Sequence, residues 1–165
     1  LPWLVLALFG GFISVHVLGI FEPVMDLHPE LFFFTPLIAA MAGNVGVQSS
    51  AIIVQGLANN TIIGPVVERL LKELSLSLLN GVILSVILLA GSYFLLGYEI
   101  HVGYTVSIAL LSVIIMASLI GTFIPIILNK YGVDPALATG PFITTSNDIL
   151  GILTYFTIAK IILGI

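Results

Sequence analysis

One aspartate, Asp148, stands in an otherwise apolar segment of this chain, ATGPFITTSNDILG at residues 138–151. Thr144 and Thr145 precede it by about one helical turn and share its face. Carboxylate, hydroxyl and carbonyl oxygens, without nitrogen or sulfur ligands, are the donors that hard cations such as Mg²⁺ prefer. The pattern predicts a divalent-cation site that includes Asp148, Thr144 and Thr145.

The dipeptide Gly140-Pro141 interrupts the same segment about two turns before the aspartate. Pro141 has no N–H to donate to the carbonyl of Leu137, which is therefore left free. Leu137 and Pro141 lie within about 40° of the direction of Asp148 at helical spacing. We therefore expect both residues to line the surface that carries the acid.

The carboxyl group needs a reason to be in this segment. Counted from Ala136 at about 1.5 Å per residue, Asp148 lies ~18 Å into a membrane span, close to the bilayer midplane. An isolated charge there costs about 2.5 to 3.5 kcal/mol on insertion scales, so it requires a partner or must be neutral. Three explanations remain open: His16, protonation, or a metal ion that comes and goes.

The composition is that of a membrane protein. Hydrophobic residues make up 59% of the 165 positions and charged residues 7%, against about a quarter charged in soluble domains. Cysteine is absent, which excludes disulfides and thiolate metal sites. A net charge of -4 with four cations leaves no basic surface for nucleic acid.

An all-α fold follows, because only helices or closed barrels satisfy every backbone polar group in lipid. Stretches of about 20 apolar residues predict five transmembrane helices in a single domain spanning residues 1–165. The predicted spans are 1–21, 35–57, 75–97, 103–128 and 136–164. The linker 58–74 is expected to form a short amphipathic helix along the membrane surface.

Cations near span ends favour the cytoplasmic side and so predict the orientation. Arg69 and Lys72 share one loop, and Lys130 lies in the loop two spans later on the same side. The N-terminus is therefore expected in the cytoplasm and the C-terminus outside the plasma membrane, with Lys160 reaching the headgroups from the outer end of the last span.

The second span has two contrasting faces. Asn44 and Gln48, with Gln55, gather on one side at about 100° per residue. The opposite side carries the small residues Ala39, Ala42, Gly43, Gly46 and Ser50, where another backbone can approach closely. Amides facing lipid would remain unpaired, so Asn44 and Gln48 either line a pore or join an interhelical amide network.

His16 is the lone histidine of the first span. Two interpretations stay open for it, a helix-to-helix hydrogen bond and a role as a ligand or proton carrier.

One aspartate supplies too little charge for a divalent ion, which suggests symmetry. A two-fold homodimer that brings two Asp148 side chains together supplies about -2 against +2, with waters bridging to Thr144 and Thr145. This arrangement is a hypothesis: a symmetric pair is the simplest way to supply a second carboxylate, and residue spacing does not prove it.

Two blocks of the sequence resemble the transmembrane domain of MgtE-type magnesium channels. They are PLIAAMAGNVGVQSSAIIVQGLA at 36–58 and DPALATGPFITTSNDILGILTYF at 134–156, similar to the second and fifth helices of that family. The resemblance implies a homodimer of five helices per protomer, with a pore on the two-fold axis lined by helices two and five. It also implies selective passage of Mg²⁺.

The resemblance further implies roles for single residues. Asp148 would bind a hydrated ion at the pore centre, helped by the carbonyl of Thr144, and Asp134 would lie near the cytoplasmic mouth and take part in gating. Ala42 and Val47 depart from the glycine-rich, polar run of many relatives. Family members also carry a cytosolic regulatory part, and we expect this chain, which opens with Leu1-Pro2-Trp3, to belong to a longer protein.

The sequence therefore predicts a divalent-cation channel or transporter, with Mg²⁺ as the ion and Mn²⁺, Ca²⁺ or Co²⁺ as alternatives. A secondary exchanger coupled to Na⁺ or H⁺ remains an open alternative. An enzyme is not expected, because the chain has no cysteine, no histidine pair at ligand spacing and no glycine-flanked serine elbow. A passive assembly subunit would leave Asp148 unexplained.

Overall fold

Long apolar helices make up the computed structural model, which describes residues 1–61, 65–138 and 140–165, and all their side chains except those of residues 2, 3, 137 and 138. In chain order the elements are α1 (Pro2–Ile20), α2 (Glu22–Leu27), α3 (Glu30–Ala58), α4 (Val66–Phe94), α5 (Ile100–Lys130), the 3₁₀ helix η1 (Pro135–Ala138) and α6 (Pro141–Leu163). No strand occurs in this described part, so the all-α prediction is confirmed.

Four of these helices, α3, α4, α5 and α6, are long and apolar enough to cross a membrane. The apolar stretch of α1 is shorter and runs over Leu4–Ile20. Large apolar side chains are exposed along the outer faces of the bundle, as expected for surfaces that meet lipid. The chain is thus a multi-pass membrane protein, and a fifth span through α1 stays a prediction.

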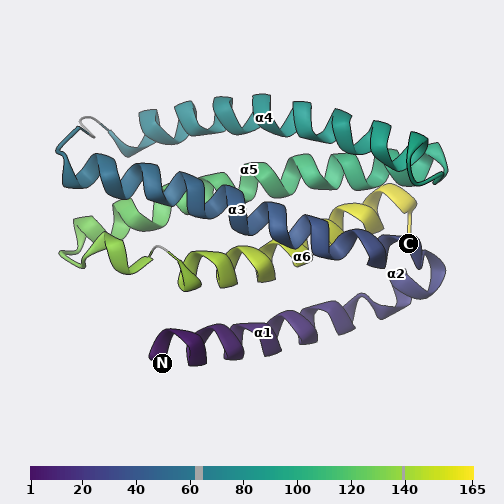
Figure 1. Ribbon diagram of the computed structural model, residues 1–165, viewed down its shortest axis with the longest axis horizontal. Coiled ribbons are helices and arrows are strands. Elements are labelled where there is room, and N and C mark those ends of the chain that lie inside the picture. Colours follow the sequence, from purple (N-terminus) through teal and green to yellow (C-terminus); the bar gives the residue numbers. More distant parts are fainter. Residues whose placement is uncertain (62–64, 139) are drawn as a thin grey trace.

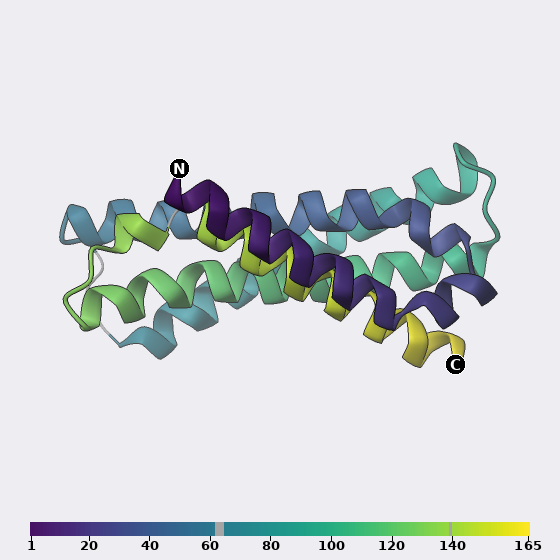
Figure 2. The same cartoon turned by 90° about the horizontal axis from the view of Figure 1, so that it is seen from below.

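Helix α5 forms the centre of the bundle. It packs against α3, α4 and α6, while α1 lies along the far side of α6 (Figure 1). Figure 2 shows α1 and α6 running side by side over most of their length. The core around α5 is closed by small and branched side chains that are wholly buried, among them Val106, Ala109, Val113 and Ala117. This packing places α3 and α6 next to each other on one side of the bundle.

Helices α3 and α5 approach each other closely at a pair of glycines. A Cβ added at Gly121 would overlap the carbonyl oxygen of Gly46 and lie 3.1 Å from its Cα. On the other side of Gly46, an added Cβ would overlap the amide of Asn147 on α6. Gly46 therefore lets α5 and α6 both approach α3, as expected of the small-residue face predicted from the sequence.

Two helix starts differ from the predicted spans. Helix α3 begins at Glu30 rather than Thr35, and Pro36 lies inside it rather than in its first turn. Helix α4 begins at Val66, directly after Pro65, so the expected surface helix over 58–74 is wrong for the described residues. Residues 66–74 instead form roughly the first two and a half turns of a continuous 29-residue helix.

The predicted break before α6 is present, but the helix starts later than expected. Gly140 has φ 83° and ψ -130°, a conformation that favours glycine, and Pro141 then occupies the first helical turn. The predicted span 136–164 therefore divides into the short η1 and α6, so the depth of Asp148 cannot be counted from Ala136 as one helix.

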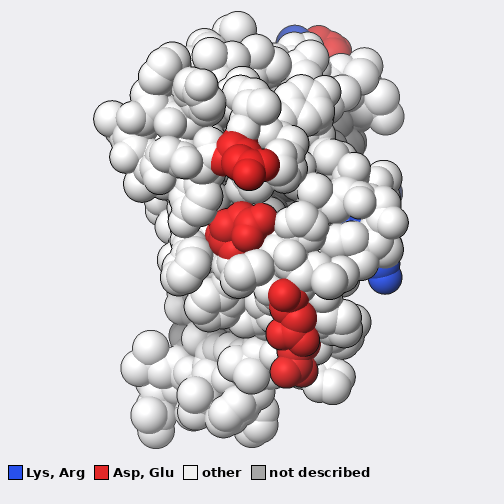
Figure 3. All heavy atoms as spheres, turned by 90° about the vertical axis from the view of Figure 1, so that its right-hand side faces the viewer, with Lys and Arg blue, Asp and Glu red and all other residues white. Residues whose placement is uncertain are grey.

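The two ends of the bundle differ in charge. Arg69, Lys72 and Lys130 lie at the basic end, where α4 begins and α5 ends. Glu22, Asp26, Glu30 and Glu99 lie at the opposite, acidic end, and Figure 3 shows acidic side chains lined up across it. Arg69, Lys72 and Lys130 thus lie in the terminal turns of helices rather than in loops, but they share one end of the bundle, as the orientation argument requires.

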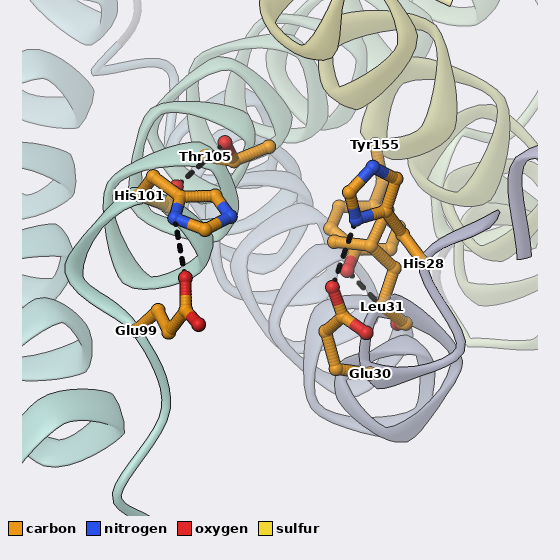
Figure 4. Close-up of polar contacts among 7 residues, drawn as sticks. All are labelled: His28, Glu30, Leu31, Glu99, His101, Thr105 and Tyr155. Atoms are coloured by element: carbon orange, nitrogen blue, oxygen red, sulfur yellow. Dashed lines mark hydrogen bonds and ion pairs between the residues drawn. The ribbon is translucent and has the colours of Figure 1, made fainter.

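Short-range contacts fix the acidic end. His28 Nδ1 lies 2.9 Å from Glu30 Oε1, and His101 Nδ1 lies 3.1 Å from Glu99 Oε2 (Figure 4). Beside the first pair, the buried Tyr155 hydroxyl on α6 donates a 2.9 Å hydrogen bond to the carbonyl oxygen of Leu31. This bond ties the second half of α6 to the first turn of α3.

Candidate cation site

A groove between α3 and α6 brings half of the predicted site residues together, namely Asp148, Thr144, Asn44 and Gln48. It has a volume of about 450 Å³. Its lining consists of Ala39, Ala40, Gly43, Asn44, Val47, Gln48, Ala51, Thr144 and Asp148. We call it the α3–α6 groove. Small side chains form its floor, so polar groups of both helices border one space.

Gly43 is the residue of α3 that lies against the acid. A Cβ added there would lie 3.4 Å from Asp148 Oδ1 and 3.4 Å from Thr144 Cγ2. Gly43 stands thirteen residues after the first residue of α3 and fifteen before its last. The carboxyl group of Asp148 is therefore level with the middle of α3.

The carboxyl group of Asp148 is half-buried and makes no hydrogen bond or ion pair among the described residues. His16 is exposed on α1 and likewise has no polar partner in the described part of the chain. An internal imidazole partner for the acid is thus not found. The groove presents a single carboxylate, and the described residues contain no group of three acidic, histidine or cysteine side chains that could hold a metal ion.

The amides of α3 also face the groove. Asn44 and Gln48 are both exposed and part of its lining, whereas Ala42 and Gly46, which are not part of the lining, are buried. Neither amide hydrogen-bonds to another described residue. Of the two predicted roles, an interhelical amide network within one chain is therefore excluded for these two side chains. Both amides remain available to water or to an ion.

Other predicted site residues lie elsewhere. Thr145 points at α1, where its methyl group would overlap a Cβ added at Gly10. Asp134 is exposed at the basic end, and its Oδ1 accepts a 2.9 Å hydrogen bond from the backbone N–H of Ala136. Pro141 heads α6 and is not part of the groove lining. The side chain of Leu137 lies outside the described residues.

Sequence reasoning missed a second buried acid, Glu73, because its charge was read as part of a loop. It is 8% exposed in the third turn of α4. Ser49 of α3 donates a 2.7 Å hydrogen bond to Glu73 Oε1, and Ser118 of α5 donates one of 2.5 Å to the same oxygen. Two hydroxyls from two other helices thus compensate the burial of this carboxylate.

Asn147 is a second residue that the sequence reasoning passed over. Its side chain is completely buried next to Gly46, and both polar atoms of its amide lack a hydrogen-bond partner among the described residues. The signal was present in the sequence, since Asn147 is offset by about 100° from Asp148 and so must face the neighbouring helix rather than the groove.

Comparison with known proteins decides the family. Residues 35–158 match the model of the MgtE family, described as divalent cation transporter. This chain belongs to the MgtE family. Its members are transporters rather than enzymes, and the apolar helices fit a membrane transport domain.

Three MgtE relatives are similar over nearly the whole chain. The magnesium transporter MgtE of Bacillus subtilis is 41% identical over 160 residues, which are 96% of this chain and 35% of that protein. The magnesium transporters MgtE of Thermus thermophilus and Enterococcus faecalis are 33% and 35% identical, over 98% and 97% of this chain and 36% and 35% of those proteins. The chain thus spans about a third of the length of these relatives.

Proposed function

We propose that this chain is the membrane domain of a magnesium transport protein, with the α3–α6 groove as one half of the ion pathway. The observation that supports the proposal most directly is the Asp148 carboxyl group, which lies level with the middle of α3 and has no polar partner among the described residues. A cation that enters and leaves the groove supplies the missing charge. The relatives named as magnesium transporters make Mg²⁺ the first candidate for that cation.

The size of the groove favours a hydrated ion. Mg²⁺ gives up its waters reluctantly and prefers six oxygen ligands in octahedral geometry. Six waters at about 30 Å³ each occupy about 180 Å³, against about 450 Å³ in the groove. An ion with its water shell therefore fits, with Asp148 balancing charge and with Asn44, Gln48 and the carbonyl of Thr144 contacting bound waters.

A second copy of the chain completes the site in this proposal. One carboxylate neutralises half the charge of Mg²⁺, and the groove lining includes no second one. Two protomers related by a two-fold axis along the groove bring both carboxylates to one ion and close the pathway between two copies of α3 and α6. Helix α1, about 28 Å long at 1.5 Å per residue, is then the fifth span.

Asp134 takes a separate part in the proposal. It lies at the basic end, which the positive-inside rule assigns to the cytoplasm, so the N-terminus is cytoplasmic and the C-terminus external. There Asp134 contacts the ion at the pathway entrance. It also takes part in gating, which the cytosolic regulatory part of the full-length protein controls. Thr145 is reassigned from the ion to the contact between α6 and α1.

Cysteine cross-linking tests the dimer axis directly, because the chain has no cysteine of its own. In Asn44→Cys, the new thiol lies in the groove and should form a disulfide between two protomers under mild oxidation. Leu79→Cys is the matched control, because Leu79 is 60% exposed on α4, away from the groove. Dimer bands of equal strength for the two variants on a non-reducing gel would rule out the axis proposed here.

A flux assay tests the channel against the exchanger. In liposomes that hold the full-length protein, an inside-negative potential should drive Mg²⁺ uptake without any gradient of Na⁺ or H⁺. Each 100 mV adds about 4.6 kcal/mol of driving force for a doubly charged ion, so uptake should rise steeply with voltage. Uptake that instead requires a counter-ion gradient would contradict the channel and favour the exchanger.

A further inference from the structure

A second pocket lies at the basic end of the bundle, where α3 ends, α4 begins and α5 ends. It has a volume of about 330 Å³. Arg69, Lys72 and Lys130, three of the four Lys and Arg residues of the chain, line it. We call it the basic pocket. The fourth cation, Lys160, lies in the last turn of α6.

The positive charge of the basic pocket is largely uncompensated. Lys72 Nζ lies 2.8 Å from Glu68 Oε1, and this exposed pair is the one ion pair formed by a lining residue in the described part of the chain. Arg69 and Lys130 have no acidic partner within 4.0 Å among the described residues. Three cations and one acid leave the pocket with a net charge of +2.

Arg69 is held in place without a partner for its charge. Its Nε is buried and makes no hydrogen bond among the described residues. Glu73 lies one turn further along α4, but its Oε1 accepts hydrogen bonds from Ser49 and Ser118, and neither of its oxygens lies within 4.0 Å of an Arg69 nitrogen. The guanidinium group therefore has donors left over, and an anion with several oxygens is the ligand that a guanidinium binds best.

The lining of the basic pocket changes from apolar to polar. Leu57, Val66 and Ile126 supply an apolar wall, while Thr61 and Asn129 add hydrogen-bonding groups next to the cations. Helix α4 begins and helix α5 ends at this pocket, so it lies at the boundary where membrane-crossing helices leave the apolar core. A ligand with an anionic head and an apolar tail matches both parts of this lining.

We propose that the basic pocket binds the phosphate headgroup of an anionic phospholipid. The phosphate lies between Arg69 and Lys130, and the glycerol and first acyl carbons lie against the apolar wall. A lipid is favoured over free phosphate for two reasons. The pocket opens at the membrane boundary, where lipid is concentrated. Its apolar wall stabilises a bound lipid but not a bound inorganic phosphate. This site is separate from the α3–α6 groove and does not depend on which ion the protein transports.

Native mass spectrometry of the full-length protein in an uncharged detergent tests the proposal. The probes are phosphatidylglycerol and phosphatidylcholine with identical acyl chains. Phosphatidylglycerol should bind the wild-type protein more tightly, and Arg69→Gln combined with Lys130→Gln should weaken that binding about tenfold or more. Lys160→Gln, which removes the cation outside the pocket, should leave the affinity unchanged.

Three outcomes would overturn the proposal. They are equal affinity for the two lipids, full retention of phosphatidylglycerol by the double variant, and displacement of phosphatidylglycerol by millimolar inorganic phosphate, which would identify a site for free anions. Lys130→Gln alone is a milder test that keeps the proposal falsifiable if the double variant does not fold. Lys130 is exposed at the end of α5, so its replacement spares the packing, and it should still weaken phosphatidylglycerol binding severalfold.

Discussion

Replacing Asp148 with asparagine should lower Mg²⁺ uptake at least tenfold while the protein still folds and assembles. The amide keeps the size of the side chain but removes its charge, and in a two-fold dimer both charges are lost together. Interactions with a charged group are each worth about 1.5–3 kcal/mol, and a tenfold effect corresponds to about 1.4 kcal/mol. Loss of two charges therefore exceeds that threshold.

The measurement is Mg²⁺ uptake into liposomes that contain equal amounts of folded protein. Glu99→Gln is the matched control, because it removes the same charge from a side chain that is 80% exposed at the acidic end, and its uptake should equal that of the wild type. Wild-type uptake by Asp148→Asn would refute the central role given to this carboxyl group.

Replacing Gly121 with alanine should destabilise the bundle by about 2 kcal/mol or more, which is the second large effect we expect. The added methyl group would overlap the backbone carbonyl of Gly46, and a backbone cannot turn aside as a flexible side chain does. Helices α3 and α5 would have to move apart. Because α3 lines the α3–α6 groove, this movement would also change the shape of the groove.

Thermal unfolding in detergent measures this effect. Gly91→Ala is the control, because a Cβ at Gly91 on α4 would meet nothing within 4 Å. That substitution should be neutral or stabilise the protein by up to about 1 kcal/mol, since alanine is the better helix former. Equal melting temperatures for the two variants would show that α3 and α5 are not in close contact at Gly121.

Much of the fold was predictable from hydropathy and from the positions of helix-breaking residues. The four long spans follow from apolar length, and Gly140-Pro141 correctly marks a break because of its backbone chemistry. Helix starts were less predictable. Glu30 and Val66 begin their helices earlier than apolar windows suggest, because a charged residue in a first turn remains helical while it reaches the polar surface.

The groove could also be anticipated in part. Helical spacing placed Thr144 with Asp148, and Asn44 with Gln48, since each pair belongs to one helix. The meeting of the two pairs across Gly43 depends on how α3 and α6 pack, which spacing within one helix does not specify. The hydroxyl partners of Glu73 come from 24 and 45 residues away in the chain, which explains why its burial was missed.

The position of α1 has a mechanical consequence. This helix is attached mainly to α6, through the tight fit of Thr145 against Gly10 in the middle of α1 and the stacked rings of Phe21 and Phe156, 5.3 Å apart, at its C-terminal end. Because these two contacts are about 16 Å apart along α1, we expect α1 and α6 to move together as one unit. A displacement of α1 is therefore expected to move α6, which carries Asp148, before it affects the other helices.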